Sequence, residues 1–358
     1  MQDPENPTDL FLALTPERVL AAVEAGGLEV NPVCYPLNSF ENRVYEVELA
    51  DRSRVVAKFY RPGRWSEEQI LEEHLFLKDL AWQEIPVCTM RPFPDGGTLK
   101  RIDNIFYALS DRRGGRAPDE LDEPGARRLG MLVGRMHNVG ARRDAEHRVH
   151  LNANTYIREN LDWLEEHDVL PHHLKDRYFD TALSIAAIAD RRLKDVPVHR
   201  IHGDLHLGNI LFRDNLLNVL DFDDMVIGPA VQDLWLALPG RDSYTATLRE
   251  RFLEGYLQFR DFDRSTLILI EPLRALRIIH YAAWIARRWH DPAFPAAWPH
   301  FGTPDYWERE TQDLEEQLAV VRGEATPEEA EARLAEESVR EEEEALSNRD
   351  FFWDWEGD

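Results

Sequence analysis

The stretch that decides the fold is HGDLHLGNIL, at His202–Leu211, followed by DFDD at Asp221–Asp224. Two short apolar segments connect these motifs; the first begins within HGDLHLGNIL and the second ends within DFDD. Arg213-Asp214-Asn215 separates them, and its composition is typical of a hairpin turn. A hairpin returns the chain on itself. We therefore expect Asn209, where the first segment begins, and Asp221, in the second segment, to lie close together.

These motifs carry three polar groups that phosphoryl transfer needs. Asp204 and Asn209 stand five residues apart, the offset of H-R-D-x-x-x-x-N, and Asp221 opens DFDD as the aspartate opens D-F-G. In this arrangement Asp204 accepts the proton of the attacking hydroxyl, while Asn209 and Asp221 offer the oxygen ligands that Mg²⁺ prefers. Each residue alone is a common turn or cap former. Their combination around a hairpin favours an active site.

The histidines of the first motif allow a second interpretation. His202 and His206 form H-x-x-x-H, which is a metal-binding pair when the segment is helical. The further His and Asp clusters that a binuclear metal site needs are not evident downstream. We therefore expect His202 to support the loop through backbone hydrogen bonds, and Asp233 in VQDLW to do the same.

A lysine in the first part of the chain extends the predicted site. Lys58 lies in VVAKFY, which is similar to the V-A-I-K strand whose lysine neutralises nucleotide phosphates. The stretch Ser66–Leu80 has helical apolar spacing, with Ser66 placed as its cap. We favour Glu73 of this helix as the partner of Lys58, because it lies beside the buried stripe, and keep Glu72 as the alternative. A solvated strand lysine and a solvated glutamate pair are the structural alternatives.

The segment LNSFENRVY, at Leu37–Tyr45, occupies the position of a phosphate-covering loop but contains no glycine. Ser39 and Asn42 are candidate nucleotide-binding residues, because a tight polar turn can direct hydroxyl, amide and backbone N–H donors at an anion. The alternative is that both residues only stabilise a turn.

The order of predicted elements is β-rich and then helical. Strands are expected within 33–60, at Met90–Phe93 and at Ile105–Leu109. Helices are expected at Thr15–Ala25, Glu123–His137, Thr155–Glu166, Asp176–Leu193 and Glu271–Asp291. In the last of these, Arg274, Arg277, Arg287 and Arg288 are expected to contact carboxylates.

This order indicates an α+β, bilobal protein-kinase-like fold with a small β-rich N-terminal lobe and a larger, mainly helical C-terminal lobe. We predict a nucleotide-binding lobe at 1–112, a helical catalytic lobe at 113–322 and an acidic tail at 323–358. The tail has 14 acidic residues and three arginines, so it contributes −11 to the formal net charge of −25.

Composition excludes several partners and compartments. A net charge of −25 argues against binding to nucleic acid or an anionic membrane, because clustered Lys and Arg hold phosphates. Two cysteines in 358 residues suit a reducing compartment. The sequence shows neither a signal peptide nor a run of the roughly 20 apolar residues that a membrane span needs. We expect a cytoplasmic protein.

Longer segments resemble a known family. HGDLHLGN matches the HGDxHxGN motif of the aminoglycoside phosphotransferase and choline kinase-like group. Within that group, PLNSFENRVYEV, VVAKFYRPGRWSEEQILEEH, GPAVQDLW and IEPLRALRIIHYAAWIARRWHDPAFP are similar to segments of the bacterial stress response kinase A family of Ser/Thr protein kinases. The resemblance covers residues 10–322.

The resemblance implies an ATP- and Mg²⁺-dependent kinase that phosphorylates Ser or Thr of protein substrates. It implies Asp204 as the proton acceptor, Asn209 and Asp221 as Mg²⁺ ligands, Ser39 as an ATP-site residue and Lys58 as the phosphate-neutralising lysine. It also implies that Asp221 counts among the catalytic residues. It further implies a cytoplasmic monomer that acts in stress survival.

Two other functions stay open on the sequence. A small-molecule kinase uses the same Asp, Asn and Asp groups on the hydroxyls of aminoglycosides, choline or homoserine. An inactive nucleotide-binding module is expected to lack at least one of Lys58, Asp204, Asn209 and Asp221, and all four are present.

The acidic tail differs from what the resemblance leads us to expect. Its final residues, FFWDWEGD, are unusually aromatic for a purely solvating segment. One interpretation is a solvated helix with a frayed end. The other is that Phe351, Phe352, Trp353 and Trp355 dock on the enzyme and regulate access to its site.

Overall fold

The computed structural model describes residues 10–11, 13–213 and 216–326, and these form two compact units. The first, which we call the sheet unit, contains the described residues up to Asp119 together with Arg142–Arg148 and Asn209–Met225. The second, the helical unit, contains Glu120–Ala141, Val149–Gly208 and the described residues from Val226 onward. The lobe boundaries at 112 and 322 stay predictions, and the proposed docking of the tail aromatics falls outside the described residues.

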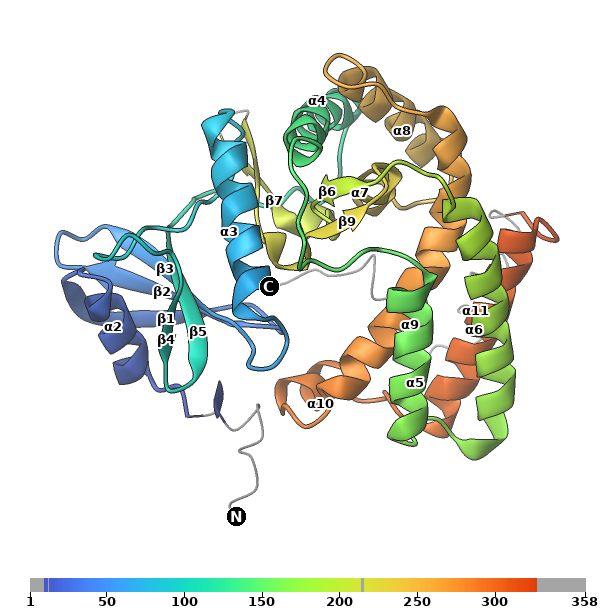
Figure 1. The fold of residues 1–358 in the computed structure, drawn as a ribbon, viewed down its shortest axis with the longest axis horizontal. Coiled ribbons are helices and arrows are strands. Elements are labelled where there is room, and N and C mark those ends of the chain that lie inside the picture. The colour runs from blue at the N-terminus through green and yellow to red at the C-terminus, as the bar shows by residue number, and fades with distance from the viewer. Residues whose placement is uncertain (1–9, 12, 214–215, 327–358) are drawn as a thin grey trace. The chain divides into compact units, whose positions relative to one another are not determined.

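The sheet unit is built on a five-stranded antiparallel sheet with the order β1-β2-β3-β5-β4 (Figure 1). Its strands are β1 (Val30–Leu37), β2 (Arg43–Leu49), β3 (Arg54–Phe59), β4 (Lys100–Ile102) and β5 (Ile105–Asp111). In the register of the central strand, Lys58 pairs with Val44 on β2 and with Ala108 on β5. Lys58 therefore lies within the sheet and not at its edge.

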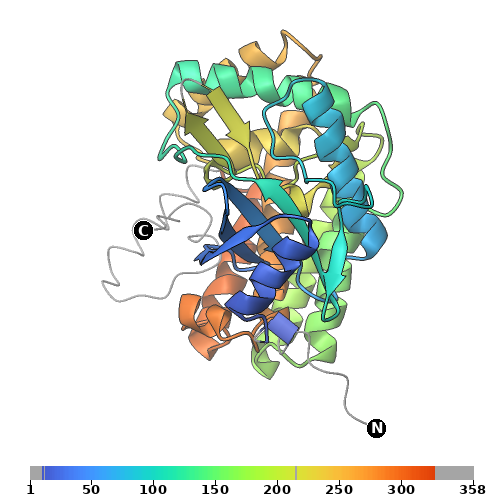
Figure 2. The same ribbon diagram turned by 90° about the vertical axis from the view of Figure 1, so that its left-hand side faces the viewer.

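The alternation of side chains along β3 explains why Lys58 faces away from the core of the sheet. Val55, Ala57 and Phe59 are buried against helix α2 (Pro16–Ala25) and its neighbours, which cover one face. Figure 2 shows α2 lying across the strands. Because successive side chains of a strand point to opposite faces, Lys58 projects from the other face.

Helix α3 (Glu67–Trp82) begins as the sequence predicts. Ser66 caps it: the Ser66 side chain accepts a hydrogen bond from the backbone N–H of Gln69, and the Gln69 side chain accepts one from the backbone N–H of Ser66. Its buried residues include Ile70, Glu73 and Leu77, which are spaced at helical intervals. The amphipathic helix is confirmed, and its buried stripe contains Glu73.

The prediction of a strand at Met90–Phe93 is wrong. This segment makes only an isolated bridge, between Met90 and Ser110, and the strand beside β5 is Lys100–Ile102. Pro92 and Pro94 have no backbone N–H to donate, so a continuous ladder cannot form here.

The hairpin that follows the first motif is present. Strands β7 (Ile210–Arg213) and β8 (Leu216–Val219) pair in antiparallel register, with Ile210 opposite Val219. Beyond this pair, Leu220 N donates to Asn209 O at 2.9 Å. A short 3₁₀ turn, η3 (Phe222–Asp224), continues from β8. The prediction that the hairpin brings its two ends together is confirmed, although the turn residues 214–215 are not described.

The helical unit contains a small two-stranded sheet and a set of packed helices. Its elements are β6 (His199–Ile201), β9 (Val226–Gly228), α4 (Glu123–Gly140), α5 (Glu159–Glu166), α6 (His172–Leu193), α7 (Val231–Ala237), α8 (Ser243–Tyr256), α9 (Ile270–Arg287), α10 (Ala293–Ala297) and α11 (Pro304–Arg322). Short turns occur at η1 (Asn154–Arg158) and η4 (Arg264–Leu269), and η2 (Leu207–Asn209) crosses the boundary between units. The predicted helices are present with slightly different ends, and the α+β kinase-like fold class is confirmed.

Two glycines allow the backbones of α4 and α8 to pack in direct contact. A Cβ on Gly130 would lie 1.9 Å from the carbonyl oxygen of Phe252, and one on Gly255 would lie 2.0 Å from that of Arg127. Any side chain at these two positions would force the helices apart. The close packing anchors α4, which supports the loop after β6.

Among the residues that the structure describes, no helix is both long enough and apolar enough to cross a membrane.

Candidate active site

Lys58 is the centre of an acidic cluster in the sheet unit. Its Nζ lies 3.4 Å from Glu73 Oε1, 3.2 Å from Asp221 Oδ1 and 3.0 Å from Asp223 Oδ1. The Lys58 side chain is 12% exposed and that of Glu73 is 1% exposed, whereas that of Asp221 is 53% exposed. The strand, the helix and the DFDD turn therefore converge on one ammonium group, and Asp221 is its solvent-facing partner.

Burial and charge act in opposite directions within this cluster. Burial disfavours the charged form of Lys58, but Asp223, Glu73 and Asp221 outweigh it and hold the lysine pKa well above its usual value. Burial raises the pKa of Glu73 to about 7, against the opposing charge of Lys58. For Asp223, burial is outweighed by Lys58, Arg64 and Arg148, so its pKa is lowered. Lys58 and Asp223 are thus a charged pair at neutral pH.

The choice between the two glutamates of α3 is resolved by their partners. Glu73 pairs with Lys58, as predicted. Glu72 instead accepts hydrogen bonds from the backbone N–H groups of Glu146, His147 and Arg148, at 2.7 to 3.2 Å. Glu72 therefore fastens a distant loop of the sheet unit to α3 and takes no part in the lysine cluster.

The predicted metal ligands lie at the base of the β7–β8 hairpin. Asn209 precedes β7, and Asp221 follows β8 with a left-handed backbone (φ 51°). Aspartate tolerates this conformation better than most residues, and such backbone outliers concentrate at functional sites. A half-exposed carboxylate and an amide oxygen fit a Mg²⁺ ion, which usually takes one or two protein ligands and completes its shell with water and phosphate. Within the described part of the chain, no three His, Cys, Asp or Glu side chains form a metal-binding group by themselves.

The glycine-free loop between β1 and β2 has a defined structure. Asn42 N donates to Ser39 Oγ at 3.3 Å, and Arg61 N donates to Asn42 Oδ1 at 3.1 Å. The Asn42 side chain is buried. The turn-stabilising role of both residues is therefore visible, while their contact with nucleotide stays a prediction.

Asp204 belongs to the helical unit, in the loop after β6. Asp233 of α7 accepts hydrogen bonds from His202 N and Gly203 N, both at 2.9 Å, and it is fully buried. His137 of α4 also contacts Asp233, at 3.0 Å. Gly203 has φ 83°, a left-handed conformation that favours glycine. The predicted supporting role of Asp233 is thus present in detail.

The carboxylate of Asp204 is held by an arginine from α9. Arg277 NH2 lies 2.6 Å from Asp204 Oδ1, and His206 Nε2 lies 3.6 Å from Oδ2. Burial favours the protonated form, but Arg277, His206 and His202 outweigh it and lower the pKa of Asp204. The predicted proton acceptor is therefore ionised and oriented.

The two histidines of the motif are directed at backbone groups. His202 Nδ1 accepts from Asp204 N at 3.2 Å, and His206 Nδ1 accepts from Gly208 N at 3.1 Å. His202 is buried and supports the loop, as the sequence predicts.

Comparison with known proteins identifies the family. Residues 34–268 match the model of the phosphotransferase enzyme family, APH. The chain is 41% identical over 315 residues to stress response kinase A of Escherichia coli (strain K12), which covers 87% of this chain and 95% of the relative. The chain belongs to the stress response kinase A branch of the phosphotransferase enzyme family. It is accordingly a kinase, and this part of the prediction is confirmed.

Two further proteins are similar to this chain. The chain is 40% identical over 316 residues to serine/threonine protein kinase RdoA of Salmonella typhimurium (strain LT2), covering 87% of this chain and 94% of the relative. Among solved structures, amicoumacin kinase hAmiN, in complex with AMP-PNP, Ca²⁺ and Ami, superposes with a TM-score of 0.68 at 20% identity, over 86% of this chain and 96% of that one. The second likeness shows the shared fold.

Three charged residues of this kinase were not assigned to the site from the sequence. Asp223 and Arg64 belong to the Lys58 cluster, and Arg277 contacts Asp204. For Arg277, the expectation that the arginines of α9 contact carboxylates was the available signal. That expectation also holds for Arg274, which lies 3.3 Å from Glu271. Arg287 NH1 donates to the amide oxygen of Asn160 at 2.6 Å, and burial lowers the pKa of Arg287 against the opposing charge of Glu159.

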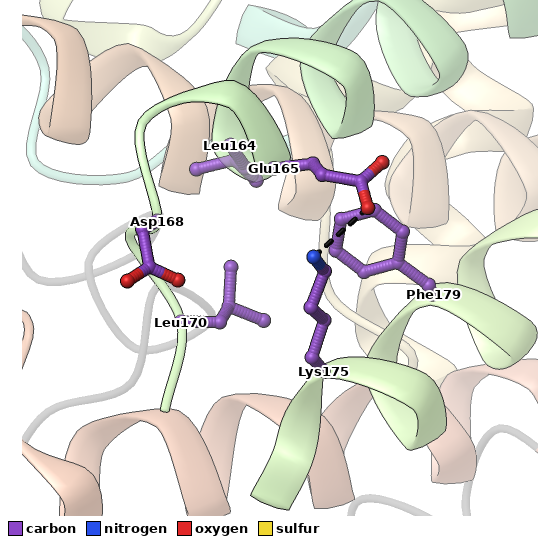
Figure 3. A pocket seen from close by; sticks show the side chains of 6 residues that line it. All are labelled: Leu164, Glu165, Asp168, Leu170, Lys175 and Phe179. Carbon is purple, nitrogen blue, oxygen red and sulfur yellow. Dashed lines mark ion pairs between the residues drawn. The ribbon is translucent and has the colours of Figure 1, made fainter. Parts of the chain in front are cut away.

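A hollow in the helical unit lies elsewhere, between α5 and α6 (Figure 3). An ion pair of 2.8 Å between Lys175 and Glu165 crosses it, and Phe179 lies beside the pair. It leaves no space for even a water-sized molecule, whereas small-molecule sites begin at roughly 300 Å³. No predicted site residue lines it, so it is separate from the candidate active site.

Proposed function

We propose that this kinase transfers the γ-phosphoryl group of ATP to Ser or Thr hydroxyls of proteins. The observation that carries the ATP-dependent phosphoryl transfer in this proposal is the convergence of Glu73, Asp221 and Asp223 on Lys58. In kinases of this fold, a strand lysine paired with a helix glutamate binds the nucleotide phosphates, and the aspartate that opens D-F-G binds the metal. Lys58, Glu73 and Asp221 have the same relationship here.

In the proposed reaction, Asp204 orients the attacking hydroxyl and takes its proton as the bond to phosphorus forms. Its ionised state suits this role, because a protonated carboxyl could not accept the proton. Arg277 restricts the carboxylate to one orientation. Most of the rate enhancement then comes from positioning and from charge neutralisation, without a covalent enzyme intermediate.

Asn209 and Asp221 would hold Mg²⁺ at the base of the hairpin. The chemistry that Mg²⁺ supplies in such sites is neutralisation of the phosphate charge. Lys58 would neutralise phosphate from the sheet side, and Ser39 and Asn42 would line the loop that covers the nucleotide. Glu73 would keep Lys58 in place.

A protein acceptor is supported by the relatives and not by the site geometry. Stress response kinase A and the Ser/Thr kinase RdoA are the similar curated proteins, and the chain covers nearly their whole length. We further propose that the enzyme works as a cytoplasmic monomer in a stress response, with Cys34 and Cys88 as the free thiols that a reducing compartment maintains.

Phosphate transfer from γ-labelled ATP tests the proposal. The purified chain is supplied with Mg²⁺ and with generic protein substrates, itself included, in parallel with a panel of small alcohols that contains aminoglycosides, choline and homoserine. We expect label on protein serine or threonine. Label on a small alcohol alone would support the small-molecule kinase, and nucleotide binding without any transfer would support the inactive module.

A further inference from the structure

The loop that replaces a glycine-rich segment is fixed by an arginine that follows β3. Arg61 Nε donates to Glu41 O at 2.9 Å, and Arg61 NH2 donates to Phe40 O at 3.0 Å. Arg61 N also holds the amide oxygen of Asn42. Successive residues of the loop are therefore fastened to the end of β3. The loop gains its shape from side-chain donors and does not need the backbone freedom of glycine.

A second arginine connects the same loop to the DFDD motif. Arg64 NH1 lies 3.2 Å from Glu41 Oε2 and 2.6 Å from Asp223 Oδ2, while Arg64 NH2 pairs closely with Asp224. Its guanidinium is mostly buried and lies over the ring of Trp65, 4.8 Å from the ring centre. A planar guanidinium offers several donors in fixed directions, so it can bind more than one carboxylate at once.

Asp223 connects Arg64 to Lys58. One of its carboxylate oxygens contacts Arg64 and the other lies 3.0 Å from Lys58 Nζ. Trp65 Nε1 also donates to Asp223, at 3.3 Å. The result is a continuous chain of charge pairs, from Glu41 through Arg64 and Asp223 to Lys58, within the sheet unit.

We propose that Arg64 is a positioning residue that sets the phosphate-covering loop, the DFDD motif and Lys58 in one fixed arrangement before nucleotide binds. This inference rests on the proposed function, because the benefit of the arrangement is a prepared site for ATP. Arg64 acts through Glu41 and Asp223. Its fork geometry matters as well as its charge.

The test compares Arg64→Lys, Arg64→Met and Glu41→Gln with the wild-type chain. Arg54→Met serves as the matched control, because Arg54 also pairs with glutamates in the sheet unit but lies on β3 away from this chain of contacts. KM for ATP and kcat are measured for each variant, and thermal unfolding verifies that each is folded. Hydrogen–deuterium exchange of residues 38–42 is followed in the nucleotide-free protein.

We expect Arg64→Met to raise KM for ATP roughly tenfold and to raise exchange in the loop by a similar factor. This is the size expected for losing the one ionic contact, with Glu41, through which Arg64 reaches the loop. Glu41→Gln should act in the same direction, and adding it to Arg64→Met should change little more. Arg64→Lys should have nearly wild-type thermal stability but a raised KM for ATP, because an ammonium lacks the planar set of donors of a guanidinium. Arg54→Met should leave KM and loop exchange unchanged.

Three results would overturn the inference. Loop exchange could fail to respond to Arg64→Met, or Arg64→Lys could restore the wild-type KM. The third is a double variant, Glu41→Gln with Arg64→Met, whose KM changes by the product of the two single effects. If Arg64→Met does not fold, KM and loop exchange of Glu41→Gln and Arg64→Lys test the inference in its place. A wild-type chain that does not bind ATP would refute the proposed function, while loop exchange would still report on the role of Arg64.

Discussion

Replacing Asp223 by Asn removes one negative charge from the most buried part of the lysine cluster. The side chain is 3% exposed, and its oxygens lie 3.0 Å from Lys58 Nζ and 2.6 Å from Arg64 NH1. Removing one partner of a buried ion pair usually costs about 3 to 5 kcal/mol, because the other charge stays buried. Here Lys58 keeps two carboxylates and Arg64 keeps two, so we expect the low end, about 3 kcal/mol.

This loss is measurable as a fall of about 6 to 12 °C in Tm, at the scale of about 2 to 4 °C per kcal/mol that applies to large domains. Thermal and urea unfolding at pH 7, followed by circular dichroism, provide the comparison. The matched control is Asp111→Asn, whose carboxylate is 70% exposed and pairs with Arg91 on the surface. Exposed pairs contribute at most about 1 kcal/mol. If Asp223→Asn were as mild as Asp111→Asn, the buried network would not stabilise the sheet unit as described.

Further predictions concern the neighbouring carboxylates. Glu73→Gln should lower kcat/KM at least about tenfold and Glu72→Gln should not, which steady-state kinetics decides. Burial raises the pKa of Glu73 from 4.5 to about 7, so its contribution to stability is full below pH 4.5 and is lost as pH rises through 7. Urea unfolding between pH 5 and 8 should show this loss in the wild type and a flatter profile in Glu73→Gln. Asp233→Asn should destabilise the chain by about 3 kcal/mol, since its charge holds the His202–Gly203 turn, and unchanged urea unfolding would contradict this. Asp221→Asn should raise the Mg²⁺ concentration for half-maximal activity about tenfold in a metal titration, and an unaltered titration would remove Asp221 as a ligand.

Much of the site was predictable because its signals are local. The likeness of VVAKFY to V-A-I-K indicated Lys58, and the helical spacing of α3 placed Glu73 beside the buried stripe. The hairpin followed from two apolar runs and a turn composition. Each of these signals depends on residues within one element or one connection.

The rest depends on contacts between distant parts of the chain. Arg64 and Asp223 are 159 residues apart, and no periodicity links them. The prediction of a strand at Met90–Phe93 was wrong because it relied on apolar composition and gave too little weight to the prolines. Asn42 was proposed as a phosphate donor, yet the same side chain accepts a hydrogen bond from Arg61, whose position becomes evident only in the folded sheet.

Single-turnover phosphate transfer by Asp204→Asn tests the central claim most directly. ATP binding is measured first by calorimetry, and transfer of the labelled γ-phosphoryl to protein serine or threonine is then measured for the variant and the wild type. Asparagine keeps the size of the side chain but cannot accept the proton. We predict nearly unchanged ATP affinity with transfer reduced at least about 100-fold, the lower value for general base catalysis. Normal transfer by Asp204→Asn would contradict the assignment of Asp204 as the proton acceptor.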